Sequence, residues 1–206
     1  MGAHLRGVVR TSTLRHVTQA VKEPRPRLRR VRVVAGDLRG RRLVAPRGSV
    51  TRPTADRVRE ALFSILGDVS GARVLDLYAG SGALGIEALS RGAAEATFVD
   101  SSEPAVNTIR QNLSNLGIEA SVHRRDALTW LAGAAGGAPF DLVFADPPYD
   151  SAVCCGPRLA ERLPTVLTEH AVIVTESNKR APLELPFPLL RERTYGDTRI
   201  AVHRHG

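Results

Sequence analysis

Cysteine is scarce in this sequence, because the 206 residues include only Cys154 and Cys155. Cysteines that are adjacent in a chain rarely form an unstrained disulfide, and two thiols alone make a poor metal site. The histidines His123, His170 and His203 have no metal-ligand spacing, and we expect them on the surfaces of strands. The sequence therefore predicts a reducing, cytoplasmic compartment and no metal cofactor.

Long apolar runs are also missing. The chain has no stretch of about 18 apolar residues, which argues against a membrane span and a membrane partner. The N-terminal region carries Arg6, Arg10 and Arg15 but lacks the apolar segment of a signal peptide. Internal repeats and coiled-coil heptads are absent as well. With 43% hydrophobic and 24% charged residues, the composition fits one globular α/β domain with at most a small appendage.

Positive charge is distributed unevenly along the chain. Residues 1–59 contain sixteen of the 29 Lys and Arg residues but three of the 21 Asp and Glu residues, so they carry +13 and residues 60–206 carry −5. A basic segment beside a mildly acidic body is expected of a phosphate-binding arm on a catalytic domain. A solvated, arginine-rich surface would give the same composition. Salt-dependent affinity for RNA separates these two interpretations.

The distribution of charge and the positions of the prolines divide the chain into three parts. Residues 1–28 are a polar, basic tail in which Pro24 and Pro26 interrupt any regular element. The sequence leaves open whether this tail is disordered, an artefact of a late start codon or an RNA-contacting extension. Residues 29–51 predict a basic β-hairpin extension, and residues 52–206 predict the catalytic domain.

The predicted hairpin rests on alternation of basic and apolar residues. This pattern, typical of half-buried strands, runs through residues 30–35 and 41–45, and a glycine-containing turn at 36–40 separates them. The candidate RNA-binding residues of the hairpin and of the segment that follows it are Arg39, Arg41, Arg42, Arg52 and Arg57. For any single hairpin arginine, solubility is an equally good interpretation. The two later arginines adjoin the stiff Pro53 segment, which favours a contact.

The segment after the hairpin predicts a helix with Thr54 as its N-cap. Its apolar stripe consists of Val58, Leu62 and Ile65, at positions i, i+4 and i+7. Arg59 and its charged neighbours lie away from that stripe.

From residue 72 onward, strand and helix patterns alternate, which predicts βαβ units and a mainly parallel sheet. The expected strands cover residues 73–77, 95–100, 119–123, 140–145 and 170–176, and the expected helices cover residues 83–91, 102–116, 126–135 and 152–163. Two late strands, 187–195 and 198–204, flank a hairpin turn at 195–198. The predicted fold is an α/β domain whose mainly parallel, seven-stranded sheet ends with an antiparallel C-terminal strand.

A glycine-rich loop follows the first of these strands. Gly80, Gly82 and Gly85 satisfy the pattern G-x-G-x-x-G between a strand and a helix, which is a weak signal when taken alone. The glycines let the backbone turn sharply and let a ligand approach closely. Asp100 ends the next strand, where an acid can bind the two hydroxyls of a ribose. Sites for NAD and for S-adenosylmethionine both use this geometry.

Three features favour S-adenosylmethionine. Asp76 precedes the glycines and can meet the cationic amino-acid end of this cofactor, whereas a carboxylate there would crowd the pyrophosphate of NAD. Asp126 follows the third strand, where an adenine amino group is commonly held, although a helix N-cap is an equally good interpretation. The third feature is the segment after the fourth strand. The other candidate cofactor contacts are Tyr78, Ser101 and Ala127.

That segment consists of Asp146, Pro147, Pro148 and Tyr149 and directly follows the strand at 140–145. The exocyclic amine of a nucleobase is a poor nucleophile because its lone pair is delocalised into the ring. A carboxylate at Asp146 and the carbonyl of Pro147 can accept its hydrogens and direct the lone pair at a sulfonium methyl. The prolines fix φ, and Tyr149 can stack on the base. Because the methyl donor is already activated, catalysis would consist of positioning and electrostatics.

Three segments together resemble the bacterial 16S ribosomal RNA guanine-N2 methyltransferase family, which is named for guanine 966 in the usual rRNA numbering. They are Arg52–Glu60 (RPTADRVRE), Asp76–Gly92 (DLYAGSGALGIEALSRG) and Asp146–Tyr149 (DPPY), and the likeness runs from about Val31 to Arg204. The resemblance implies a Rossmann-like class I S-adenosylmethionine methyltransferase fold and a hairpin that grips rRNA. It also implies action on an assembled or nearly assembled 30S subunit, and we expect a monomer.

The chain departs from the family pattern in two places. Asp100 stands where glutamate is the usual ribose ligand, so the shorter side chain needs a water or a shifted ribose. The tail at 1–28 lies outside the resemblance, and no family property applies to it.

Three alternatives stay open. An amino-methyltransferase for another base, such as adenine N6 in DNA or RNA, would share the residues 146–149, and analysis of the product separates it. An NAD-dependent oxidoreductase would be stabilised by NADH and not by S-adenosylhomocysteine. A non-catalytic RNA-binding protein requires that Asp146→Ala leave every measurable function intact.

Overall fold

A computed structural model of the chain describes residues 1–2, 31–45 and 56–206. The tail at 3–30, the predicted N-cap Thr54 and the candidate RNA contact Arg52 lie outside the described residues. Among the helices described, none combines the length and the apolar character that crossing a membrane requires.

A seven-stranded sheet forms the centre of the molecule, with the strand order β5-β4-β3-β6-β7-β9-β8. The strands are β3 (Arg73–Leu77), β4 (Glu95–Asp100), β5 (Ser121–Arg124), β6 (Phe140–Ala145), β7 (Leu167–Asn178), β8 (Leu189–Tyr195) and β9 (Thr198–Arg204). The strands from β5 to β7 pair in parallel, and β9 runs antiparallel to both of its neighbours. The predicted sheet is confirmed, although β5 begins later and β7 is longer than the sequence pattern indicated.

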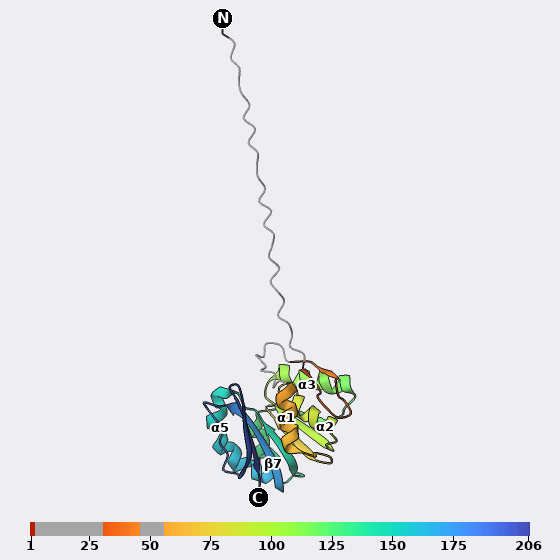
Figure 1. Ribbon diagram of the computed structural model, residues 1–206, viewed down its shortest axis with the longest axis vertical. Coiled ribbons are helices and arrows are strands. Elements are labelled where there is room, and N and C mark those ends of the chain that lie inside the picture. The colour runs from red at the N-terminus through yellow and green to blue at the C-terminus, as the bar shows by residue number, and fades with distance from the viewer. Residues whose placement is uncertain (3–30, 46–55) are drawn as a thin grey trace.

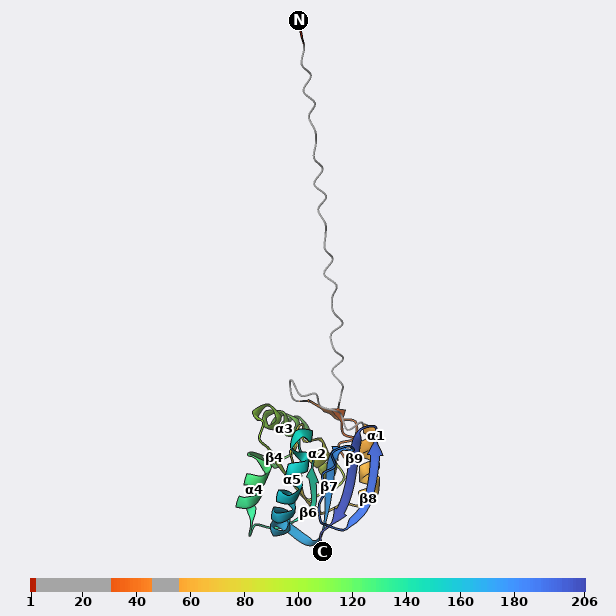
Figure 2. The same ribbon diagram turned by 90° about the vertical axis from the view of Figure 1, so that its left-hand side faces the viewer.

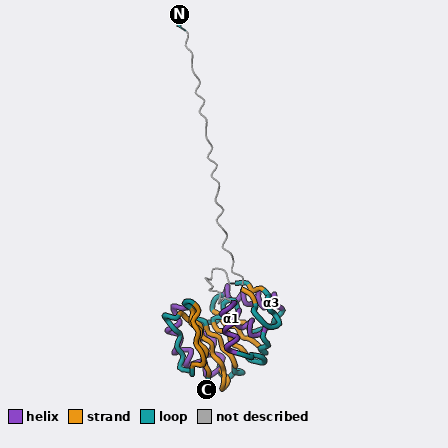
Figure 3. Tube along the Cα trace, in the orientation of Figure 1, coloured by secondary structure: helices purple, strands orange, loops and turns teal. Residues whose placement is uncertain are grey.

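Helices cover both faces of the sheet (Figure 1, Figure 3). On one face lie α1 (Asp56–Leu66), α2 (Ala83–Ser90) and α3 (Glu103–Leu116), and on the other lie α4 (Ala127–Ala134), α5 (Tyr149–Arg162) and the short 3-10 helix η1 (Leu163–Val166). The central strands are therefore buried on both sides, which explains why they are continuous apolar runs.

Strand β6 shows how the sheet separates two cores. Leu142 and Phe144 belong to the cluster beneath α1, α2 and α3, whereas Val143 and Ala145 belong to the cluster beneath α4 and α5. Successive side chains of a strand point to opposite faces, so one apolar segment contributes to both cores. Phe63 of α1 packs on Phe144 with ring centroids 5.9 Å apart, which fixes α1 against the middle of the sheet.

The predicted hairpin is present but short. Its strands β1 (Val31–Arg32) and β2 (Arg42–Leu43) pair antiparallel over two residues each. Val31, Val33 and Leu43 are buried in the same core cluster as α1 and α2. The hairpin therefore packs on the domain over its helical face instead of extending from it as a separate arm.

Helix α1 packs its predicted apolar stripe on the core, but it buries a wider face than that stripe. Arg59 is only 2% exposed and is buried together with Leu62 and Phe63, while Val58 and Ile65 are half-buried. Arg59 was expected away from the buried stripe, but it is buried because the hairpin covers this side of α1, where its Nη2 donates to the carbonyl of Arg32. The sequence pattern considered the helix alone, and the covering element comes from a different segment of the chain.

Two further expectations are wrong. Helix α5 begins at Tyr149, not at residue 152, so it starts within the DPPY segment. His203 was expected on a strand surface but is 2% exposed, and its Nδ1 lies 3.1 Å from the carbonyl oxygen of Phe187. Burial lowers the pKa of His203. It is buried because the segment that contains Leu183 and Leu185, both buried, covers this face of β9.

Candidate active site

The two motifs singled out in the sequence meet at one edge of the sheet. Leu77, the last residue of β3, pairs with Val99 of β4 on one side and with Ala145 of β6 on the other. The next residues of those strands, Asp100 and Asp146, therefore flank the glycine-rich loop (residues 78–82). The chain order reverses on the two sides of β3, and parallel sheets bind ligands at the carboxyl ends of such strands.

The glycine-rich loop turns through left-handed backbone conformations. Gly80 has φ 58° and Gly82, the N-cap of α2, has φ 76°. Tyr78 is the only residue other than glycine with a positive φ (58°) within the described ranges. An aromatic residue in this conformation is strained, and such strain concentrates at binding sites where the surrounding structure holds it. The loop is thus built to expose its backbone at the carboxyl end of β3.

Gly85 has a packing role beside any contact with a cofactor. A Cβ atom added to Gly85 would overlap the ring of Phe98 and would lie 3.2 Å from Oδ2 of Asp76. The absence of a side chain lets the first turn of α2 approach β3 and β4 closely. The Gly85 N–H donates to Oδ2 of Asp76 at 3.0 Å.

Asp76 is a buried carboxyl group directly beneath the loop. It is 3% exposed, and burial raises its pKa to about 8, with a smaller contribution from the charge of Asp100. The hydrogen bond from Gly85 opposes this shift. A cationic ammonium group placed beside Asp76 would favour the ionised carboxylate and offset the cost of burying it. The predicted ligand class for this residue, a cationic amino-acid end, fits its environment.

Asp100 fastens the loop to the end of β4. Its Oδ2 accepts from the Gly80 N–H at 2.9 Å, and its Oδ1 accepts from the Ser102 N–H at 2.8 Å. Each carboxylate oxygen has a second lone pair, so ribose hydroxyls can still donate to it. The neighbouring candidate Ser101 is exposed at the same edge. Asp100 therefore has a loop-holding role that the sequence did not show.

Asp126 is the N-cap of α4, as one of its two interpretations predicted. Its Oδ1 accepts from the Thr129 N–H at 2.9 Å and from the Thr129 hydroxyl at 3.0 Å. Asp126 is exposed, whereas Ala127, the first residue of α4, is buried. Both lie beyond the end of β5, at the same edge of the sheet as the loop.

The DPPY segment joins β6 to α5. Asp146 is exposed, Pro147 is buried, and Pro148 is the N-cap of α5 with φ −52° and ψ 137°. Tyr149 is the first residue of α5, and its side chain lies outside what the structure describes. The two prolines hold the backbone extended between a buried strand and a helix, so Asp146 projects from a rigid support.

Below this edge, the hydroxyl of Tyr78 lies 3.8 Å from the sulfur of Cys155, which is a buried free thiol. Burial raises the pKa of Tyr78 well above its ordinary value. In the part of the chain that the structure describes, no three His, Cys, Asp or Glu side chains are grouped so as to hold a metal ion.

Comparison with known proteins identifies the family. Residues 31–204 match the model of the family described as Conserved hypothetical protein 95. The chain belongs to this family. The ribosomal RNA small subunit methyltransferase D of Haemophilus influenzae is 36% identical over 178 residues, which cover 81% of this chain and 89% of that protein.

Solved structures agree with the family assignment. The hypothetical protein TTHA0928 of Thermus thermophilus superposes with a TM-score of 0.73 and 31% identity, covering 84% of this chain and 98% of that one. The ribosomal protein L11 methylase of Lactobacillus delbrueckii subsp. bulgaricus is 21% identical with a TM-score of 0.58, covers 73% of this chain and 78% of its own, and shares the fold alone. The predicted Rossmann-like class I methyltransferase fold is confirmed.

In this member of the Conserved hypothetical protein 95 family, the matched region begins with β1 and ends with β9. The hairpin is thus part of the family unit. It is attached to α2 through Glu87, which is fully buried. The Glu87 carboxylate accepts from the Val34 N–H at 2.7 Å and from the Ala35 N–H at 2.9 Å, and it pairs with Arg91 at 2.9 Å and Arg59 at 3.6 Å.

Asn112 of α3 connects the hairpin to the glycine-rich loop. Its Oδ1 accepts from the Val44 N–H at 2.8 Å, and its Nδ2 donates to the carbonyls of Val44 and Ser81, both at 3.0 Å. Asn112 is 1% exposed. Asn112 and Glu87 were not among the predicted site residues, and their only signal in the sequence is a polar residue on the buried side of each helix.

Four of the five candidate RNA-binding arginines lie within the described residues. Arg39, Arg42 and Arg57 are exposed. Arg41 is exposed as well, but its Nη2 donates to the carbonyl of Asn115 at 2.8 Å, near the C-terminal end of α3. Arg41 therefore has a structural contact in addition to any contact with RNA.

Proposed function

We propose that this chain transfers the methyl group of S-adenosylmethionine to the exocyclic N2 amine of a guanine in 16S rRNA, guanine 966 in the usual numbering. One observation carries the proposal: the glycine-rich loop above Asp76 and the exposed Asp146 leave adjacent strands at the same edge of the sheet. Such a site can hold a methyl donor next to an amine. The name of the Haemophilus influenzae relative supports ribosomal RNA of the small subunit as the substrate.

The residues on the β3 and β4 side fit the cofactor. Asp76 would bind its ammonium group, Asp100 its ribose hydroxyls, and Gly80 and Gly82 would let it approach the backbone. When it is bound, S-adenosylmethionine supplies a methyl group that is already activated by its sulfonium. The protein's contribution is then to orient this end of the site and to exclude water.

The residues on the β6 side fit the base. The Asp146 carboxylate and the Pro147 carbonyl would accept the two hydrogens of the amine and direct its lone pair. Asp146 need not be a strong base, because the amine becomes acidic only as it acquires the methyl group and its proton can leave afterwards. A paired base must first be unstacked, for which Tyr149 would provide a stacking surface.

The hairpin would hold the rRNA through Arg39, Arg41 and Arg42, together with Arg52 and Arg57 of the following segment. A contact with the phosphate backbone gives affinity and orientation without reading sequence. We include in the proposal that the enzyme acts as a cytoplasmic monomer on an assembled or nearly assembled 30S subunit.

The test is methylation of small subunits purified from a bacterial strain that lacks the homologous enzyme. With S-adenosylmethionine, the wild-type chain should form N2-methylguanosine, detected by nucleoside analysis. Asp146→Ala should reduce the rate by about 100-fold to 1,000-fold or more, as expected for losing a group that stabilises the transition state. Its affinity for S-adenosylhomocysteine should stay within about tenfold, because the carboxylate serves the base.

Two results would contradict the proposal. Formation of N6-methyladenosine would assign the chain to the amino-methyltransferases for adenine. Equal loss of methylation and of cofactor affinity in Asp146→Ala would show that this carboxylate belongs to the cofactor site.

A further inference from the structure

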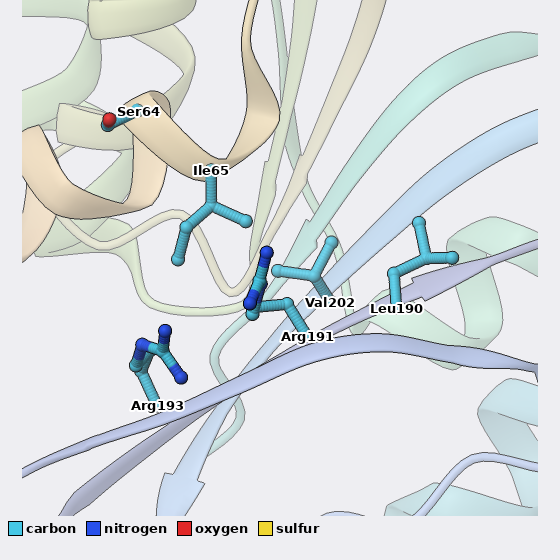
Figure 4. A pocket seen from close by; sticks show the side chains of 6 residues that line it. All are labelled: Ser64, Ile65, Leu190, Arg191, Arg193 and Val202. Atoms are coloured by element: carbon cyan, nitrogen blue, oxygen red, sulfur yellow. The ribbon is translucent and has the colours of Figure 1, made fainter.

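Helix α1 lies beside β8 and β9 at one end of the sheet (Figure 2), and a surface groove between them is lined by the side chains in Figure 4. We call it the α1–β8 groove, and its volume is about 340 Å³. It is lined by Ser64 and Ile65 of α1, Leu190, Arg191 and Arg193 of β8, and Val202 of β9. Three of the lining residues are apolar, and the cationic groups come from β8, the strand at the free edge of the sheet.

The strand register places both arginines on the α1 side. Arg191 pairs with Val202 and Arg193 pairs with Ile200 across the antiparallel β8–β9 ladder. Directly opposed residues share a face, and Val202 and Ile200 belong to the core cluster beneath α1. Figure 4 shows the two guanidinium groups pointing into the groove toward α1.

These arginines differ from Arg199, which lies on the other face of the same strand pair. Arg199 is 7% exposed and forms ion pairs with Glu192 at 2.9 Å and Glu184 at 3.4 Å. Within the described ranges, no ion pair joins Arg191 or Arg193 to a carboxylate. Arg193 donates only to the carbonyl of Glu192, at 3.1 Å. Two guanidinium groups at positions i and i+2 of one strand repel each other unless an anion lies between them.

The groove lies level with the candidate active site. Arg193 of β8 is opposite Ile200 of β9, and Ile200 is in turn opposite Glu176 of β7. The residue before Glu176 is opposite Ala145, the last residue of β6. Arg193 and Asp146 therefore lie at the same position along the strand direction. They are three strand spacings apart across the sheet, which is about 14 Å. A few nucleotides of a nucleic acid strand span that distance.

We infer that the α1–β8 groove binds phosphate groups of the rRNA strand that flanks the methylated nucleotide. This inference rests on the proposed function. The charge layout supports RNA as the occupant, because residues 60–206 carry a net −5 and yet leave two guanidinium groups uncompensated at this edge. The hairpin and the groove then hold the RNA from the two sides of α1, with the ends of β3 and β6 nearby.

The deciding experiment compares the wild-type chain with the double variant Arg191→Gln/Arg193→Gln. The dissociation constant for protein-free 16S rRNA and for small subunits is measured over a range of salt concentrations. Each lost phosphate contact lowers the salt slope by about 0.7 to 0.9, so we expect a decrease of about 1.4 to 1.8. In methylation assays KM for the subunit should rise, while kcat at saturating subunit and the thermal shift with S-adenosylhomocysteine should stay unchanged.

Two control variants make the result specific. Arg204→Gln removes the same charge from the same face of β9, beyond Val202 and outside the groove lining, and should leave the salt slope unchanged. Arg191→Lys/Arg193→Lys keeps both charges and should retain most of the slope. Thermal unfolding of every variant separates a binding defect from a folding defect.

A wild-type salt slope in the double glutamine variant would overturn the inference. Weaker binding to the intact subunit, with unchanged binding to protein-free rRNA, would also overturn it and would indicate a ribosomal protein as the occupant. If the wild-type chain methylates no rRNA, the proposed function fails, and that result is visible before any variant is compared.

Discussion

The glycine-rich loop and the basic hairpin are held to the domain by different kinds of contact. The loop and the first turn of α2 are fixed mainly by carboxylates at the ends of the two nearest strands, with Asp76 bonded to Gly85 and Asp100 bonded to Gly80. The hairpin has only two residues per strand and depends on Glu87 and other side chains more than 50 positions away. The first region therefore depends mainly on the βαβ unit that contains it, and the second depends on contacts with distant parts of the chain.

This difference has a functional consequence. The helix α2 begins at the loop and carries Glu87, while Asn112 bonds both to Val44 of the hairpin and to Ser81 of the loop. Asn112 thus bonds to both the element proposed to hold RNA and the loop proposed to hold the cofactor, whereas Glu87 bonds to the hairpin from the helix that follows the loop. We expect changes at these two residues to affect RNA binding and domain stability more than they affect cofactor binding.

The largest effect on stability should come from Glu87→Ala. It leaves two hairpin N–H groups without an acceptor and removes the more buried of the two carboxylates, Glu87 and Asp56, that pair with Arg59. Removing one partner of a buried ion pair costs about 3–5 kcal/mol. Urea unfolding measures this free energy. Glu95→Ala, at an exposed ion pair with Arg73, serves as control and should cost less than about 1 kcal/mol. A similar small loss at Glu87 would show that the hairpin is not anchored there.

The hairpin turn offers a matched pair of glycines. Gly36 and Gly40 both have φ 80°, but a Cβ on Gly36 would overlap the carbonyl oxygen of Ser90, and a Cβ on Gly40 meets nothing within 4 Å. Gly40→Ala should therefore cost only backbone strain, about 1–2 kcal/mol. Gly36→Ala should cost that amount plus displacement of the hairpin from α2. Denaturant unfolding and RNA binding of both variants test this, and equal losses would contradict the close approach.

Asn112→Leu should weaken the connection between hairpin and loop. The variant leaves the N–H and carbonyl of Val44 and the carbonyl of Ser81 without their partner, which costs about 1–3 kcal/mol. We expect KM for the RNA substrate to rise more than the dissociation constant for S-adenosylhomocysteine. Asn107→Leu, at an exposed position of the same helix, is the control and should change neither. Loss of cofactor affinity alone would mean that Asn112 serves only the loop.

The smallest expected effect is a pH dependence on the cofactor side. The pKa of Asp76 is about 8 in the free protein, and a bound ammonium group would lower it. Binding then releases a proton, so affinity for S-adenosylhomocysteine should rise between about pH 7 and pH 8, by at most about tenfold. Isothermal titration calorimetry measures this trend. Asp76→Asn should flatten it, and a flat profile in the wild type would place the ammonium elsewhere.

The sequence predicted most of the strands and helices because the central βαβ units carry strong, local apolar patterns. It failed where a covering segment came from elsewhere in the chain. Arg59 and His203 were expected at the surface, but the hairpin covers one and the segment around Leu183 covers the other. A pattern within one helix or strand contains no information about which distant element packs on it.

The candidate site divides in the same way. The sequence by itself determined the motifs: a carboxylate and glycines after one strand, and an acid with two prolines after another. Only the tertiary structure decided that β3 and β6 are neighbours, so that Asp76 and Asp146 meet at one edge. It also decided that Asn112 joins the hairpin to the loop and that Arg191 and Arg193 face α1 without ion-pair partners in the described chain. Motifs depend on neighbouring residues, whereas strand order, burial and charge pairing depend on contacts between residues far apart in sequence.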